Sequence, residues 1–235
     1  MPSSRPTPSP ITAATPPASV APRPTETETP PQPPAKPLYV VAIGASAGGL
    51  DALEKLFASL PADCGAAFVV IQHLSPDHKS MMASLLARHT RMPVVMVEED
   101  LPIVPNQVFL IPPGSIMHMD GRLLRLTPKN PRTLTLPIDV FFQSLATHHG
   151  DHAVGVVLSG TGSDGTRGAG AINEAGGFLL AQDPENAKFD GMPRSVIATG
   201  LVDAILPVEV MAQRIVAHIT NQPAPLSDAD RQPLG

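Results

Sequence analysis

The sequence of 235 residues contains one cysteine, one tyrosine and no tryptophan. The single thiol, Cys64, cannot form an intramolecular disulfide, so a reducing compartment is expected. The formal net charge is −5 and no basic stripe runs through the chain, which argues against a nucleic-acid partner. With so few aromatic rings, the chain also has little on which bases could stack.

Long apolar runs are missing as well. No stretch approaches the ~20 apolar residues that a transmembrane helix needs. The N-terminus lacks the basic and then apolar segments of a secretory signal peptide. We therefore expect a cytoplasmic protein that does not insert into a membrane.

Proline is abundant and unevenly placed. Of the 29 prolines, 13 fall within residues 1–37, a segment without apolar periodicity that we expect to be disordered or polyproline-like. Residues 221–235 form a second polar stretch, expected to be a flexible C-terminal tail. The domain between them, residues 38–220, is long enough to bury a substantial core without disulfides or metal ions.

Within that domain, short apolar runs alternate with amphipathic segments. Strands are predicted at residues 38–43, 66–72, 94–97, 153–158, 178–181 and 202–206, and helices at 50–60, 79–89, 138–148, 166–175, 193–198 and 208–219. This alternation predicts an α/β fold, with a doubly wound, mostly parallel sheet and helices on both faces. Three further runs (108–111, 115–119 and 122–126), the last two joined by Asp120-Gly121, indicate an antiparallel hairpin at one edge.

The first strand leads into Gly44-Ala45-Ser46-Ala47-Gly48, which fits the G-x-S-x-G pattern of a nucleophile elbow. Small neighbours leave room for a substrate beside Ser46, and the helix that follows offers free N–H groups and the positive end of its dipole. The same turn could instead hold a phosphate, or Ser46 could merely cap the helix.

Two other predicted strands end in reactive side chains, His73 after residues 66–72 and Asp164 after residues 153–158. Ligands of such sheets bind at the carboxyl ends of the strands, so Ser46, His73 and Asp164 are expected at one edge. A serine needs a base to become a nucleophile, and an imidazole works better when a carboxylate orients it. The order Ser…His…Asp differs from the Ser…Asp/Glu…His order of α/β-hydrolases.

A nucleotide-binding Rossmann-like module is the main alternative. Ser46 stands where G-x-G-x-x-G requires its second glycine, and His73 stands where an acidic residue would contact the ribose. A metal site built from His73, Asp77 and His78 lacks further ligands at a recognisable spacing. No cofactor and no metal are therefore expected. The other histidines are interpreted as structural or solvated: His89, His118, His148, His149, His152 and His218.

Several motifs occur in the same order as in a known family. Ile43–Gly49, Gln72–Leu74, Leu158–Gly165, Gln182–Asp183 and Gly191–Arg194 resemble the catalytic domain of CheB, the chemotaxis protein-glutamate methylesterase. Asp77–Ser80 and Arg88–Val94 are most similar to the versions fused to a CheR methyltransferase. The resemblance covers about residues 38–220.

The resemblance implies a hydrolase with Ser46, His73 and Asp164 as its triad. It implies hydrolysis of γ-glutamyl methyl esters on chemoreceptors, deamidation of receptor glutamines, and a doubly wound sheet with a hairpin at one edge. Thr161 stands where the chemotaxis enzymes often carry methionine, and Arg194 is expected to contact an acidic receptor surface or to form a structural salt bridge. The oxyanion and substrate-loop candidates are Ala47, Gly48, Thr161, Gly162 and Arg194.

Residues 1–37 are too short and too rich in proline to be the receiver domain of the best-known members, and no methyltransferase follows residue 219. We therefore expect activity that is constitutive or controlled by a separate regulator, and a substrate that is a methylated chemoreceptor or another signalling protein. A non-catalytic signalling scaffold of the same fold is the third interpretation. The presence of Ser46, His73 and Asp164 together argues against it.

Overall fold

The computed structural model describes residues 37–72, 81–130 and 132–221 of the chain. Residues 1–36 and 222–235, which hold nearly all of the two expected tails, lie outside this description, as do His73, Asp77 and His78. No helix in the described ranges combines the length and hydrophobicity needed to cross a bilayer.

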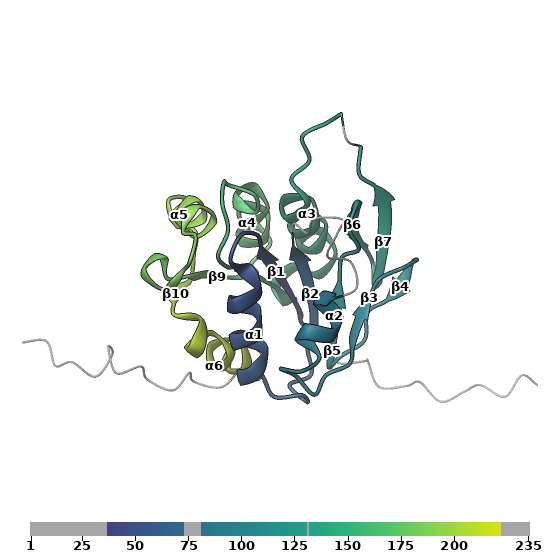
Figure 1. Ribbon diagram of the computed structural model, residues 1–235, viewed down its shortest axis with the longest axis horizontal. Coiled ribbons are helices and arrows are strands. Elements are labelled where there is room, and N and C mark those ends of the chain that lie inside the picture. The colour runs from purple at the N-terminus through teal and green to yellow at the C-terminus, as the bar shows by residue number, and fades with distance from the viewer. Residues whose placement is uncertain (1–36, 73–80, 131, 222–235) are drawn as a thin grey trace, which may run out of the picture. The chain divides into compact units, whose positions relative to one another are not determined.

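A seven-stranded parallel sheet forms the centre of the domain (Figure 1). Its strand order is β10-β9-β8-β1-β2-β5-β3. Each pairing of neighbouring strands in this sheet is parallel, so the carboxyl ends of the strands share one edge. The strands are β1 (Val40–Ala45), β2 (Ala67–Gln72), β3 (Val94–Met96), β5 (Gln107–Leu110), β8 (Ala153–Val157), β9 (Phe178–Gln182) and β10 (Ala204–Leu206).

The central strand β1 is buried along its whole length because both faces of the sheet are covered. Val40 and Ala42 belong to one hydrophobic core, and Val41 and Ile43 belong to the other. This alternation follows from the two-residue period of a strand, which sends successive side chains to opposite faces.

Three helices contribute to each core. The core containing Val41 includes residues of α1 (Gly49–Ser59), α2 (Met81–Leu86) and α6 (Val208–Ile219), and the other includes residues of α3 (Pro137–His149), α4 (Thr166–Glu174) and α5 (Gly191–Ile197). Burial of a large side chain such as Leu53 or Phe57, both fully buried, contributes about 1.5–3 kcal/mol. The predicted doubly wound fold is confirmed.

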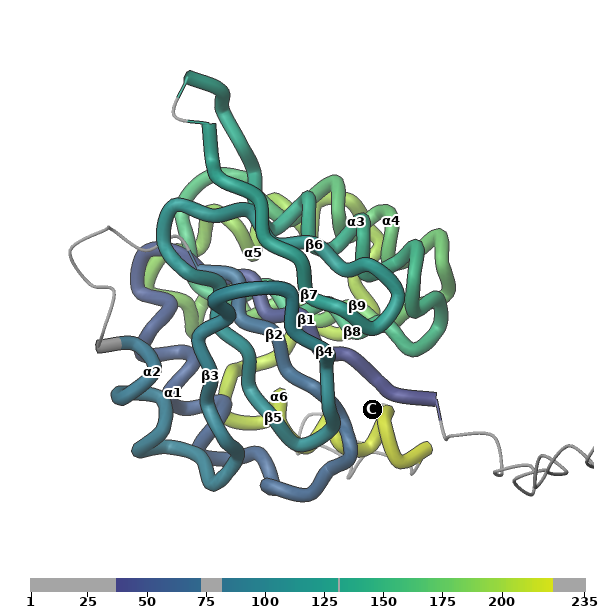
Figure 2. Tube along the Cα trace, turned by 90° about the vertical axis from the view of Figure 1, so that its right-hand side faces the viewer, coloured from purple at the N-terminus to yellow at the C-terminus, as the bar shows by residue number. Residues whose placement is uncertain are grey.

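The antiparallel strands form a sheet of their own, in the order β4-β7-β6 (Figure 2). They are β4 (Leu101–Pro102), which the sequence did not predict, β6 (Ser115–Asp120) and β7 (Leu123–Pro128). The predicted run 108–111 belongs instead to β5, between β2 and β3 of the parallel sheet. The small sheet packs on α3, where the Met119 N–H donates to Ser144 Oγ at 2.9 Å.

Aromatic rings gather around His218 near the start of β1. The imidazole of His218 stacks on Phe178, with ring centroids 4.1 Å apart, and meets the Tyr39 ring edge-on at 5.6 Å. Its Nε2 atom is buried and has no partner among the described residues. Burial, together with the nearby positive charge of Arg214, lowers the pKa of His218, while the carboxylate of Asp203 acts in the opposite direction.

This stacking predicts that acid destabilises the fold. The ordinary imidazole pKa is 6.5. Below pH 6.5 His218 takes up a proton in the unfolded chain but stays neutral in the folded chain, because its pKa there is lowered. The contribution of neutral His218 to the free energy of unfolding is therefore complete above pH 6.5 and is lost as the pH falls through the lowered pKa. Urea denaturation at about pH 7.5 and about pH 5.5 should show a smaller acid-induced loss in His218→Phe than in the wild type. An equal loss in both proteins would contradict the assignment.

Candidate active site

Ser46 lies in a tight turn directly after β1. The Gly49 N–H donates to the Ser46 carbonyl at 2.9 Å, and Gly48 has φ 69° and ψ 1°. These angles fit the third residue of a type II turn, a position that favours glycine. Gly48 occupies the N-cap position of α1, and no side chain caps that helix. Ser46 is therefore not the N-cap residue of α1.

Small residues allow the loop after β8 to contact this turn. A Cβ atom built on Gly160 would lie 2.9 Å from Ser46 Cβ and 2.2 Å from Met192 Sδ. A Cβ atom on Gly48 would lie 2.9 Å from both Ser159 Oγ and Lys188 Cβ. Only glycine fits at either position without displacing these neighbours.

The buried hydroxyl of Ser159 joins three loops. Its Oγ donates to the Ala47 carbonyl at 2.9 Å and accepts from the Phe189 N–H at 3.0 Å. Its backbone carbonyl accepts from the Ser46 N–H at 3.0 Å. Its own N–H donates at 2.8 Å to Oε1 of Gln182, another buried polar residue. These bonds set the position of the Ser46 turn relative to the loops that follow β8 and β9.

Asp164 is 5% exposed and accepts two backbone hydrogen bonds from the first residues of α3. The Ile138 N–H donates to Oδ2 at 3.1 Å, and the Asp139 N–H donates to Oδ1 at 2.9 Å. A carboxylate at this place satisfies N–H groups that the helix cannot bond internally and complements its dipole. Asp164 therefore fixes the start of α3 against the loop that follows β8.

Of the predicted triad, two members lie in described loops at the same edge of the sheet. Ser46 follows β1 and Asp164 belongs to the loop after β8, and these strands are direct neighbours. On the other side of β1, Ala45 lies opposite Gln72, so β1 and β2 end at the same level. His73 follows Gln72 in the sequence and lies outside the described residues.

The remaining candidates differ in their surroundings. Among the described residues, the N–H groups of Ala47, Gly48, Thr161 and Gly162 donate to no acceptor, and Thr161 and Gly162 are exposed. Arg194 is held by carboxylates: its Nε lies 2.5 Å from Asp190 Oδ2, and its Nη2 lies 3.9 Å from Glu185 Oε1.

The Arg194 guanidinium lowers the pKa of the Asp190 carboxyl through their hydrogen bond. This contact is the structural salt bridge that the sequence left open as one of two roles for Arg194.

Other reactive groups lie elsewhere. Cys64, the only cysteine of the sequence, precedes β2 at the amino end of that strand, and burial raises the pKa of its thiol. The described ranges contain no cluster of three or more His, Cys, Asp or Glu residues that could hold a metal ion. The metal site considered for His73, Asp77 and His78 falls outside those ranges.

Sequence reasoning assigned no role to Ser159, Gln182 or Asp139, which the structure places among the buried polar residues. Asp139 accepts from the Gly168 N–H at 2.9 Å and so joins α3 to α4. Polar residues directly after the apolar runs 153–158 and 178–181 were the available signal for Ser159 and Gln182. Their partners are distant in the chain, so pattern alone could not assign them.

The sequence model of one family, described as CheB methylesterase, matches residues 41–215. The chain belongs to the CheB methylesterase family. The crystal structure of the CheB methylesterase catalytic domain of Thermotoga maritima is similar, with a TM-score of 0.71 and 27% identity over 76% of this chain and 97% of that one. The chain therefore has the fold of a CheB catalytic domain.

Curated relatives include longer proteins. A Burkholderia lata protein-glutamate methylesterase/protein-glutamine glutaminase is 38% identical over 80% of this chain and 56% of its own length. A 104.1 kDa protein of Rhodobacter capsulatus is 58% identical over 60% of this chain and 15% of its own length. The chain thus spans about half the length of the curated methylesterases it matches.

Removing the Ser159 hydroxyl should destabilise the site. Ser159→Ala leaves the Ala47 carbonyl and the Phe189 N–H without their buried partner, at a cost of about 1–3 kcal/mol in the free energy of unfolding. Urea denaturation measures this loss. Ser163→Ala, an exposed position in the same loop, is the matched control and should change stability by less than about 0.5 kcal/mol. Equal stability of the two variants would show that the bridging bonds contribute nothing.

Proposed function

We propose that the chain is a serine hydrolase that removes methyl esters from γ-glutamyl side chains of chemoreceptors or related signalling proteins, and that it also deamidates glutamines. The observation that carries the proposal is the position of Ser46 and Asp164 in the loops that follow the neighbouring strands β1 and β8, in a chain of the CheB methylesterase family. The relatives named protein-glutamate methylesterase/protein-glutamine glutaminase support this substrate class.

In the proposed reaction, His73 removes the proton of Ser46 while the hydroxyl oxygen attacks the ester carbonyl. The tetrahedral intermediate collapses as the imidazolium returns the proton to the leaving methoxide, which departs as methanol. Water, deprotonated by His73, then attacks the acyl-enzyme and releases the glutamate carboxylate and Ser46. Asp164 orients the imidazole and stabilises its protonated form. With a glutamine substrate the leaving group is ammonia.

Charge on the tetrahedral oxygen requires hydrogen-bond donors. The N–H groups of Ala47 and Gly48 follow Ser46, and those of Thr161 and Gly162 belong to the loop that contacts it at Gly160. None of the four donates to an acceptor in the described part of the chain. We assign the oxyanion site to donors from this set, each worth roughly 10²–10³ in turnover.

The competing interpretations fit less well. A dinucleotide site needs a glycine at position 46 and an acidic side chain after β2, and the chain has serine and histidine there. A pure scaffold could use Asp164 to hold α3 but has no need of Ser46, whose side chain does not cap α1. Cys64 has a raised thiol pKa and precedes the opposite end of β2, so it is a poor nucleophile candidate.

The enzyme is proposed to act in the cytoplasm, without a cofactor, under the control of a separate regulatory protein or of none. A contact of Arg194 with an acidic receptor surface stays part of the proposal, because its bond to Asp190 uses Nε and its side chain is 59% exposed.

Replacing the nucleophile tests the reaction class. Ser46→Ala should reduce methanol release from a methylated chemoreceptor fragment to background, because no oxygen remains to form the acyl-enzyme. Its melting temperature should stay within a few degrees, since the Ser46 backbone bonds to Ser159 and Gly49 are retained. Headspace gas chromatography of methanol with wild-type enzyme as reference measures the rate. Turnover equal to that of the wild type would sink the serine-hydrolase proposal.

Asp164 should serve both stability and turnover. In the wild type, each carboxylate oxygen of Asp164 accepts a hydrogen bond from a backbone N–H of α3. In Asp164→Asn the amide NH₂ replaces one of these oxygens and cannot accept, so one bond is lost and the free energy of unfolding should fall by about 0.5–2 kcal/mol. Turnover should fall by about 10²-fold or more, because the imidazole loses its orienting charge. Both quantities are measured on the same preparation. A stability loss with turnover within about threefold of the wild type would restrict Asp164 to anchoring α3.

A further inference from the structure

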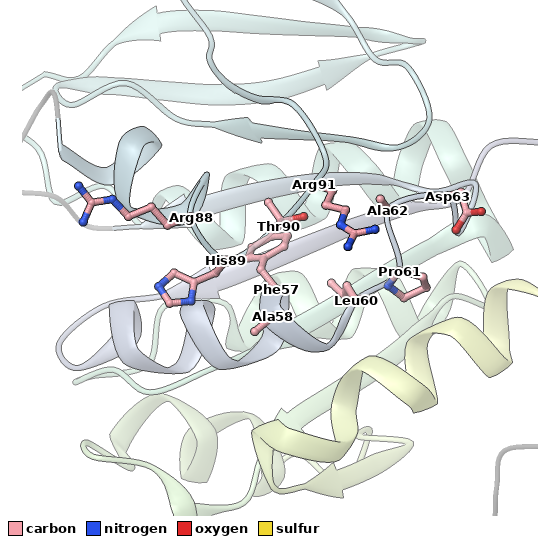
Figure 3. A pocket seen from close by; sticks show the side chains of 10 residues that line it. All are labelled: Phe57, Ala58, Leu60, Pro61, Ala62, Asp63, Arg88, His89, Thr90 and Arg91. Atoms are coloured by element: carbon pink, nitrogen blue, oxygen red, sulfur yellow. The ribbon is translucent and has the colours of Figure 1, made fainter.

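A groove lies beside the last turn of α1 (Figure 3). Its volume is about 730 Å³, and it is bounded by the end of α1, the residues that follow it, and the turn after α2. The helix α1 begins beside the Ser46 turn and has 11 residues, so its far end lies about 16 Å from that turn.

The floor of the groove is apolar and its rim is charged. Phe57 is fully buried and Leu60 is 7% exposed, and both line the groove. Arg88 and Arg91 stand on the turn after α2, which is closed by hydrogen bonds from Arg88 N–H to the Leu85 carbonyl and from His89 N–H to the Leu86 carbonyl. Phe57 and Leu60 are almost completely covered, so the apolar surface that a ligand can touch comes from the exposed Ala58 and Pro61, beside the two cationic side chains.

Neither arginine has a carboxylate partner within the described ranges, and both are exposed. Arg125 does pair with a carboxylate, of Asp120, and so does Arg194, with Asp190, whereas Arg122 and Arg214 have no ion pair in the described ranges. The imidazole of His89 on the same turn lies 3.8 Å from a carboxylate oxygen of Glu54. In a chain with a net charge of −5, two unpaired guanidinium groups on one groove are a local positive charge without an internal counterion.

The directions of the side chains restrict the shape of a ligand. In Figure 3, Arg88 and Arg91 extend away from each other along the groove, and Asp63 lies at the end opposite to Arg88. One phosphate or carboxylate ion could contact only one of the two guanidinium groups. An extended peptide, rising about 3.3 Å per residue, could present acidic side chains to both arginines and apolar ones to Ala58 and Pro61.

We propose that this groove binds an acidic, partly apolar segment of a partner protein. The acidic residues of the segment meet Arg88 and Arg91, and the Asp63 end receives a neutral or basic residue. The two guanidinium groups are complementary in charge to the acidic residues of such a segment, and Ala58 and Pro61 offer its apolar residues a small contact surface. None of the lining residues is among the proposed catalytic residues.

A structural role for Arg91 gives different expectations. The last turn of α1 contains no basic residue of its own, and a cation near a helix C-terminus is stabilising by about 0.3–1 kcal/mol. If compensation of that dipole were the only role of Arg91, its removal would lower the melting temperature and no acidic peptide would bind.

Fluorescence anisotropy with the full 235-residue chain tests the proposal. The probe is a fluorescein-labelled peptide, Glu-Leu-Ser-Glu-Leu-Ser-Glu-Leu-Ser, and the control probe carries Gln in place of each Glu. The acidic probe should bind, the Gln probe should bind at least about tenfold more weakly, and added salt should weaken the acidic probe. Arg88→Ala combined with Arg91→Ala should weaken it by about tenfold or more.

Two further variants separate charge from folding. Ala58→Glu places a negative charge on an exposed position of α1 that lines the groove, keeps both arginines, and should also weaken the acidic probe. Arg122→Ala, an exposed arginine of the hairpin turn, is the matched control and should bind within about twofold of the wild type. Melting temperatures are measured for every variant.

Three results would overturn the proposal: no binding of the acidic probe, equal binding of the Gln probe, or unchanged binding in both groove variants. Complete displacement of the probe by inorganic phosphate at low millimolar concentration would reassign the groove to a small anion, and would overturn it too. Because the assay measures binding, its result is independent of the proposed catalytic role of Ser46.

Discussion

The parallel pairing of β1 with β2 on one side and β8 on the other is the constraint on which the site depends. Parallel strands end at the same edge, so the residues that follow these three strands are brought together although they lie far apart in the chain. The strands are apolar along their length and are buried on both faces. Polar chemistry is therefore confined to the loops where the strands end.

Those loops are held by a few buried polar bonds and by close backbone approach. The Ser159 hydroxyl and the Gln182 amide satisfy backbone groups that would otherwise be buried without partners. Glycine at positions 48 and 160 lets neighbouring loops approach the Ser46 turn, where any Cβ atom would collide. The geometry around Ser46 is thus set by residues that need not touch a substrate.

Charge is arranged differently in different parts of the domain. Beside the site, Arg194 of α5 forms an ion pair with Asp190, the N-cap residue of that helix, four positions earlier. Arg88 and Arg91 line the groove beside α1 together with buried Phe57, and neither has a carboxylate partner in the described part of the chain. Both sets are exposed, so the difference lies in the availability of a local carboxylate and not in burial.

By itself, the sequence determined the fold class and most element positions, because strand and helix periodicities are local and strongly apolar here. It also placed Ser46 and Asp164 at strand ends, since reactive side chains follow directly on apolar runs. It did not determine that the 108–111 run joins the parallel sheet as β5. Nor did it determine that β4 pairs with β7 of the hairpin, or that the hairpin packs on α3. Short runs carry no information on which strand they will pair with. Only the tertiary structure decided that Ser159 bridges three loops and that Asp164 holds the start of α3, because both depend on partners more than 20 residues away in the chain.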